Sequence, residues 1–162
     1  MKSLFKLLLI SLLILNSGCG GGGTDGGGGT NPTPDPSVGD LIKKVWTVSS
    51  ASWDGTVQFE SSASSNIISG YSAFKLDLST AGSVKLTEFD GNLFSGSYSI
   101  NTEGSQLELT NLSSTNGAPS GTEGKVVFKI LAKPTSTSMT IETSANYIKA
   151  SNKIVKLVLK AS

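Results

Sequence analysis

The chain has 162 residues, of which 13 are lysine or arginine and 12 are acidic, so its formal net charge is +1. It contains no histidine and one cysteine. Histidine is the usual general base near neutral pH and a frequent zinc ligand. The composition therefore excludes serine triads, cysteine–histidine pairs and histidine-bound zinc. It also disfavours a nucleic-acid partner, because the lysines form no basic cluster beyond Lys43 and Lys44.

The first segment, residues 1–18, has the pattern of a secretory signal peptide. Lys2 and Lys6 precede the apolar run LLLISLLIL at 7–15, and the small residues Ser17 and Gly18 follow it. The run is too short to span a bilayer, which takes about 20 residues. A buried N-terminal helix is the alternative, but the glycines that follow would separate it from any core. We expect export and removal of this segment.

The single cysteine, Cys19, comes directly after the signal peptide. The stretch LNSGC at 15–19 resembles the lipobox of bacterial lipoproteins, in which the cysteine becomes the first mature residue and is lipidated. Asn16 stands where leucine is usual, as in the looser lipoboxes of Bacteroidota-type lipoproteins. The resemblance implies a firm membrane anchor on Cys19, because stable anchoring needs more than one acyl chain. The alternative is a plain secreted protein with a free thiol.

Residues 19–39 read as a lipidated cysteine followed by a disordered tether. Glycines fill 20–23 and 26–29, and Pro32, Pro34 and Pro36 stiffen its end. A flexible coil of this length reaches roughly 25 Å. Gly20 replaces the aspartate that retains some lipoproteins at the inner membrane, so we expect an outer-membrane protein facing either the periplasm or the exterior.

Residues 40–162 read as one all-β domain. A helical turn is expected at 39–44, and apolar and polar residues then alternate with the period of half-buried strands. About nine short strands are expected, joined mostly by tight turns. The ten candidate segments are 45–53, 56–60, 74–78, 83–89, 93–100, 106–112, 125–132, 138–143, 146–150 and 154–161, of which 146–150 is the weakest. This spacing predicts an antiparallel up-and-down β-barrel, with a β-sandwich as the alternative.

The unit FSGSYSINTEGSQLEL at 94–109, together with a tryptophan on the first strand, resembles the lipocalin-like domains of bacterial lipoproteins. The chain departs from lipocalins at Lys44, where glycine is expected, and in having no arginine. The resemblance implies a barrel that binds a small hydrophobic ligand. The residues expected to line its cavity are Trp46, Phe59, Phe74, Leu76, Leu86, Phe94, Tyr98, Leu109, Phe128, Ile130 and Leu157, each of which could equally be ordinary core.

Two hypotheses of function remain open. The first is a lipid-anchored carrier with a small apolar ligand in its barrel, which needs a cavity of about 300 Å³ or more. The second is a filled barrel that works as a structural or interaction module through its serine- and threonine-rich loops. The acidic residues read as scattered surface charge rather than a catalytic pair. We therefore expect a monomer with no enzymatic activity, no metal and no cofactor.

Overall fold

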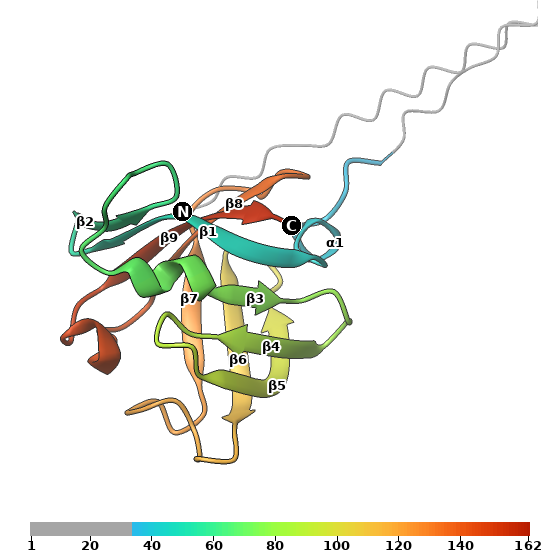
Figure 1. The fold of residues 1–162 in the computed structure, drawn as a ribbon. Helices are drawn as coiled ribbons and strands as arrows, with labels where there is room; N and C mark the ends of the chain where they lie inside the picture. The colour runs from blue at the N-terminus through green and yellow to red at the C-terminus, as the bar shows by residue number, and fades with distance from the viewer. Residues whose placement is uncertain (1–33) are drawn as a thin grey trace, which may run out of the picture. The chain divides into compact units, whose positions relative to one another are not determined.

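The computed structural model describes residues 34–162, which form one compact unit (Figure 1). These residues hold a closed strand ladder around one hydrophobic core, which are the features of a unit that can fold on its own. It includes the last residues of the predicted tether. The predicted signal peptide, Cys19 and the glycine tract lie outside the described residues.

The unit is all-β, with short helical turns at three places. Its elements are α1 (Val38–Leu41), β1 (Val45–Trp53), β2 (Thr56–Glu60), the 3₁₀ turn η1 (Ser69–Ala73), β3 (Lys75–Asp77), β4 (Ser83–Thr87), β5 (Leu93–Ile100), β6 (Gln106–Ser113), β7 (Val126–Ile130), β8 (Ser138–Thr143), the 3₁₀ turn η2 (Ile148–Ala150) and β9 (Val155–Ala161). Within residues 34–162, no helix is long and apolar enough to cross a membrane.

Eight of the strands close into an antiparallel up-and-down barrel. From β3 to β9 each strand pairs with the next, and β9 returns to β1 between Trp46↔Ala161 and Trp53↔Val155. The other edge of β1 is shared: β3 pairs with its first residues and β2 with its last. The predicted up-and-down barrel is therefore confirmed, and the closed ring rules out the sandwich alternative.

The inward-facing residues follow the period of two that strands require, with interruptions in β1 and in β6, where Leu109 and Leu112 are buried three positions apart. Trp46 and Val48 point inward, and so does Ala51, three positions later. A register shift against β9 between Val48 and Ser50 explains this spacing, because a β-bulge adds one residue and restores the inward face. The bulge lets one long strand follow the curvature of the barrel.

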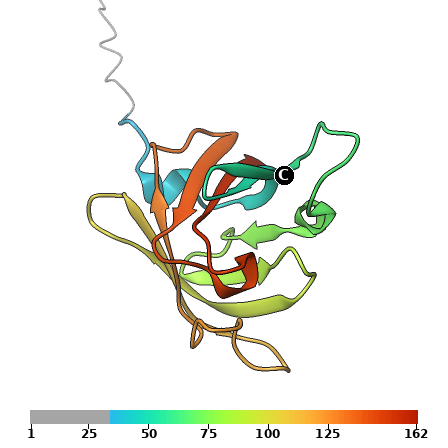
Figure 2. The same ribbon diagram turned by 90° about the vertical axis from the view of Figure 1, so that its left-hand side faces the viewer.

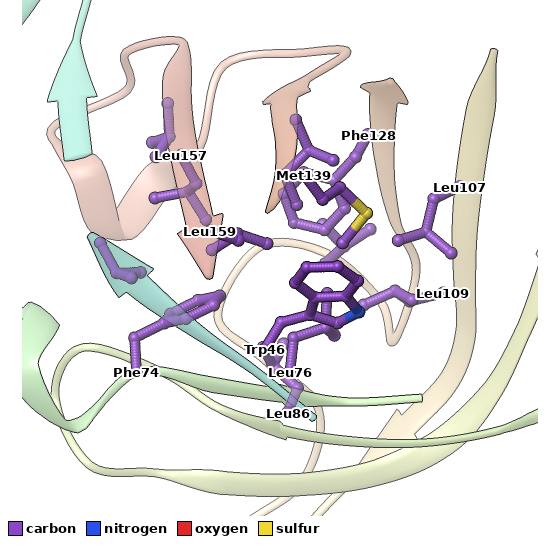
Figure 3. Packing of buried hydrophobic residues seen from close by; sticks show 14 of the residues in the cluster. Trp46, Phe74, Leu76, Leu86, Leu107, Leu109, Phe128, Met139, Leu157 and Leu159 are labelled. Carbon is purple, nitrogen blue, oxygen red and sulfur yellow. The ribbon is translucent and has the colours of Figure 1, made fainter. Parts of the chain in front are cut away.

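The core fills the barrel from wall to wall. Figure 3 shows Trp46 among Leu76, Leu86, Leu109 and Met139, all of which are buried. Trp46 is fully buried, and its indole Nε1 donates a hydrogen bond to the carbonyl of Ile42 at 2.8 Å. This bond ties the tryptophan to the turn after α1, so α1 and Trp46 together close one end of the barrel.

The two ends of the barrel differ. At the helix end, the chain enters through α1, and short turns at 78–82, 101–105 and 131–137 join the strands. At the loop end lie the β4–β5 turn and two longer connections, 114–125 between β6 and β7 and 144–154 between β8 and β9. Figure 2 shows α1 and the β6–β7 loop at opposite ends of the molecule.

One segment differs in kind from its sequence prediction. Residues 146–150 were expected to form a strand, but the structure has a bridge from Tyr147 to Lys153 and the turn η2 between them. Ser151 and Asn152 follow with left-handed backbone, at φ 54° and 58°. The segment thus folds back on itself over the loop end instead of pairing with a neighbouring strand. The turn η1 was also not anticipated.

Candidate binding site at the loop end of the barrel

A small cavity lies inside the barrel near the loop end. It has a volume of about 20 Å³. Its lining is largely apolar and consists of Tyr71, Phe74, Leu86, Glu88, Phe89, Val126, Phe128, Thr143, Tyr147, Val155 and Leu157. This volume is enough for about one water molecule. It is far below the roughly 300 Å³ at which small-molecule sites begin.

The cavity brings together some of the residues predicted to bind a ligand. Phe74 and Phe128 line it, as do Leu86 and Leu157. Trp46, Leu76, Leu109, Phe59 and Ile130 are buried in the core without lining the cavity. Phe59 comes from β2 and packs against Tyr71, with 6.2 Å between the ring centroids.

The two remaining predicted residues lie at different ends. Phe94, on β5, is buried beneath the ammonium group of Lys149, which lies 5.4 Å from its ring centroid. Tyr98 is half-buried, and its hydroxyl donates to the carbonyl of Leu78 at 3.2 Å, next to the turn at the helix end. The aromatic residues therefore do not form one continuous pocket.

A cluster of aromatic side chains covers one side of the cavity. The Tyr71 and Phe89 ring centroids lie 4.9 Å apart, and those of Trp53 and Phe89 lie 6.1 Å apart. The indole Nε1 of Trp53 donates to the Tyr71 hydroxyl at 2.7 Å. Burial raises the pKa of Tyr71 to about 12, and the negative charge of Glu88 acts in the same direction. This cluster attaches η1 to β1 and to the β4–β5 turn.

The opening of the barrel at the loop end is the mouth. Four polar side chains close the part of it that the aromatic cluster leaves open. They are Glu88, Asp90, Tyr147 and Lys149, and we call them the latch. Tyr147 donates its hydroxyl to one carboxylate oxygen of Glu88, and Lys149 donates to the other. Lys149 also contacts Asp90 at 2.7 Å. Glu88 is only 2% exposed, so the latch neutralises a buried charge. It joins the β4–β5 turn to the β8–β9 connection.

The latch shifts the pKa of three of its members. Burial raises the pKa of Tyr147, and its hydrogen bond to Glu88 raises it further. Burial alone would lower the pKa of Lys149, but its bonds to Asp90 and Glu88 outweigh this effect and raise it. Burial alone would raise the pKa of Asp90, yet Lys149 and the Asn92 backbone N–H hold it below its usual value. Lys149 and Asp90 are therefore both charged across the physiological range.

An open groove lies on the outer side of the same mouth. It has a volume of about 400 Å³ and is lined by Gln106, Gly121, Thr122, Lys125, Val126, Val127, Thr143, Ser144, Ala145, Asn146 and Tyr147. Three of these residues, Val126, Thr143 and Tyr147, also line the inner cavity. They are the wall between the groove and the barrel interior.

The latch was not predicted from the sequence, in which the acidic residues read as scattered surface charge. A signal was nevertheless present for Glu88. Val84 and Leu86 are the inward positions of β4, and Glu88 continues the same period of two. The contacts of Tyr147 and Lys149 carry no such signal, because they join segments about 60 residues apart along the chain, at separations of 59 and 61. Within residues 34–162, no group of three His, Cys, Asp or Glu side chains is placed to hold a metal ion.

Comparison with known proteins gives distant structural similarity only. No protein-family model and no curated protein matches the chain. A lipocalin-like protein from Bacteroides uniformis is similar in structure, with a TM-score of 0.47 and 17% identity over 75% of this chain and 99% of that protein. An uncharacterized protein from Bacteroides eggerthii gives a TM-score of 0.42 and 16% identity over 74% and 98%. The barrel assignment itself rests on the closed ring of strand pairs.

Proposed function

We propose that the protein is a membrane-tethered, non-catalytic binding module that uses the loop end of a filled barrel as its recognition surface. One observation carries this proposal: the cavity in the barrel has a volume of only about 20 Å³. An eight-stranded barrel can be filled by its own side chains. A filled barrel supplies a rigid support, and its loops then supply the contacts.

The direction in which the chain enters the unit supports this reading. Ser37 caps α1 at the helix end, where Asp35 also contacts Lys133 of the β7–β8 turn. The longer connections lie at the other end of the barrel. With an acyl anchor on Cys19, as the lipobox-like sequence predicts, the loop end would be the part farthest from the attachment point. Anchoring in an outer membrane would then present the groove and the loops to the periplasm or the exterior.

The polar groups at the mouth favour binding over catalysis. Glu88 is the buried carboxylate of the site, and Tyr147 and Lys149 occupy both of its oxygens. A general base needs free access to the proton that it removes. The latch gives Glu88 a structural role instead, and the absence of histidine from the chain agrees with this role.

A second candidate is the carrier of a small hydrophobic ligand. The observation that favours it is the shared wall, because only Val126, Thr143 and Tyr147 line both the inner cavity and the groove of about 400 Å³. A rearrangement of this wall would connect the two spaces. The carrier function thus requires a second, open conformation of the protein. The module function requires only the closed conformation described above.

Site-specific photo-crosslinking in cells that produce the full chain tests the proposed function. A photoreactive residue is placed at Ile148 on η2, and a matched one at Leu131 at the helix end; both are exposed aliphatic side chains, at 55% and 44%. We expect crosslinked adducts of defined mass from position 148. The same adducts should be absent when the photoreactive residue is at position 131. Equal adducts from both positions, or none from 148, would contradict recognition at the loop end.

A further inference from the structure

We infer that Tyr147 is a gate between the groove and the barrel interior, and that its release admits a small apolar molecule carrying a hydroxyl group. This inference goes beyond the module function and rests on the second candidate, the carrier. It follows from where the Tyr147 ring lies, what its hydroxyl binds and how its segment is held.

The position of the ring makes Tyr147 the movable part of the wall. Val126 belongs to β7 and Thr143 to β8, and both are fixed by the strand ladder. Thr143 is held further by a hydrogen bond of 3.0 Å from the Val155 N–H to its hydroxyl. Tyr147 lies outside the strands and is half-buried. Moving its ring outward would join the inner cavity to the groove and add the volume of the ring itself.

The segment that carries Tyr147 can move without breaking the barrel. Its backbone bonds are local: the Tyr147 N–H donates to the Lys153 carbonyl at 2.9 Å, and the Asn152 N–H donates to the Tyr147 carbonyl at 3.0 Å. The stretch 147–153 is therefore closed by its own backbone bonds, and the latch and the buried Ala150 hold it against the barrel. The ends of the 144–154 connection are bonded to the barrel, Ser144 to Val127 and Ile154 to Asp54. Local openings of such loops take less free energy than global unfolding.

The contact at Glu88 indicates the chemistry of the ligand. Tyr147 itself places an apolar ring over an apolar cavity and a hydroxyl donor on a buried carboxylate oxygen. When Tyr147 leaves, that oxygen loses its donor, and an unpaired buried acceptor is unfavourable. A ligand with an apolar body and an O–H group would replace both contacts. An apolar molecule without a hydroxyl would replace only the first.

The charge at the mouth disfavours anionic ligands. Glu88 and Asp90 face the ammonium group of Lys149, so the latch carries two negative charges and one positive charge. The nearby pair Lys153 and Asp54 adds no net charge. A carboxylate placed beside Glu88 would be repelled. A neutral phenol or alcohol is therefore favoured over a fatty acid.

The experiment uses residues 34–162 and three probes: para-ethylphenol, ethylbenzene and butyrate. We expect Tyr147→Ala to bind para-ethylphenol at least about tenfold more tightly than the wild type, because the wild type must first open. In this variant we expect ethylbenzene to bind at least about fivefold more weakly, since it gives Glu88 no donor, and butyrate not to bind. Tyr98→Ala is the matched control, because its ring is also half-buried but does not line the cavity.

Three results would overturn the inference. They are equal para-ethylphenol affinity in Tyr147→Ala and Tyr98→Ala, equal affinity for the two ring probes in Tyr147→Ala, and preference for butyrate. A second measurement covers the case in which Tyr147→Ala fails to fold. In the wild type, para-ethylphenol should shift the NMR signals of Val126 and Thr143, and the absence of any shift at saturating probe would also overturn the gate. None of these results would change the crosslinking expected at Ile148. The gate and the module function are therefore tested separately.

Discussion

Lys149 donates hydrogen bonds to Glu88 and to Asp90, and these contacts join η2 to the β4–β5 turn across the mouth of the barrel. The Glu88 side chain is 2% exposed and that of Lys149 14%. Water therefore screens the pair poorly, unlike the more exposed ion pairs elsewhere in the unit. The contact makes the closed mouth dependent on both partners.

Replacing Lys149 with methionine should destabilise the protein strongly. The substitution keeps most of the side-chain volume but leaves the buried Glu88 charge with only the Tyr147 hydroxyl. Breaking a buried ion pair on one side typically costs about 3–5 kcal/mol. Urea denaturation of residues 34–162 measures the change in the free energy of unfolding.

Two further variants make this result specific to the latch. Adding Glu88→Gln to Lys149→Met removes the uncompensated charge, so we expect it to restore part of the lost stability. Lys153→Met breaks an exposed pair with Asp54, in which the side chains are 44% and 49% exposed, and should change stability little. Equal losses in Lys149→Met and Lys153→Met would show that burial of the pair is unimportant.

Gly70→Ala should detach η1 from the β4–β5 turn. A Cβ at Gly70 would lie 2.0 Å from the carbonyl oxygen of Phe89, so the two backbones must move apart. Overpacking of this kind costs about 1–3 kcal/mol. Thermal unfolding and near-UV circular dichroism of the Phe89 and Trp53 surroundings measure the effect. Gly39→Ala is the control, since its Cβ would find only the Ser37 hydroxyl at 3.7 Å, and it should unfold like the wild type.

Stability should fall at alkaline pH through Tyr71. Its pKa is about 12 in the folded protein against an ordinary value of 10.0. The unfolded chain therefore releases this proton first, and the stabilising contribution, complete below pH 10, is lost as the pH rises towards 12. The raised pKa values of Tyr147 and Lys149 act in the same direction. Urea midpoints should thus decline above about pH 10, and less steeply in Tyr71→Phe. An identical decline in both proteins would exclude a role for Tyr71.

Cys19→Ala should release the protein from the membrane. The prediction rests on the lipobox-like sequence, because the acyl chains on the cysteine would be the attachment. Fractionation of cells that produce the full chain, followed by immunoblotting, measures the distribution. Ser17→Ala, which keeps a small residue and the cysteine, should remain in the membrane fraction. If Cys19→Ala also remains there, the anchor lies elsewhere.

The sequence was sufficient for the barrel because its strands carry their own pattern. The segments 45–53 and 56–60 match β1 and β2 to the residue, and period-two alternation with tight turns predicted the up-and-down order. The segment 146–150 failed because Tyr147 and Ile148 fit a strand locally, whereas a strand also needs a partner. Whether a partner is available depends on distant residues.

The candidate site was predictable only in part. Phe74 and Phe128 line the cavity as the inward pattern predicts, since a strand position fixes which face a side chain takes. The latch was not foreseen, because its contacts join the β4–β5 turn to η2. The inward position of Glu88 continues the alternation of β4, but the position of Lys149 over Phe94 does not follow from local alternation.

Native mass spectrometry of residues 34–162, purified from cells without refolding, tests the central claim most directly. A barrel with a cavity of about 20 Å³ should give the mass of the bare chain, because a ligand that enters only a rare open state does not survive purification. Solvent extraction of the same sample should then yield no stoichiometric small molecule. A retained lipid or apolar metabolite at one copy per chain would mean that the barrel holds a preformed site, and it would contradict the filled-barrel account.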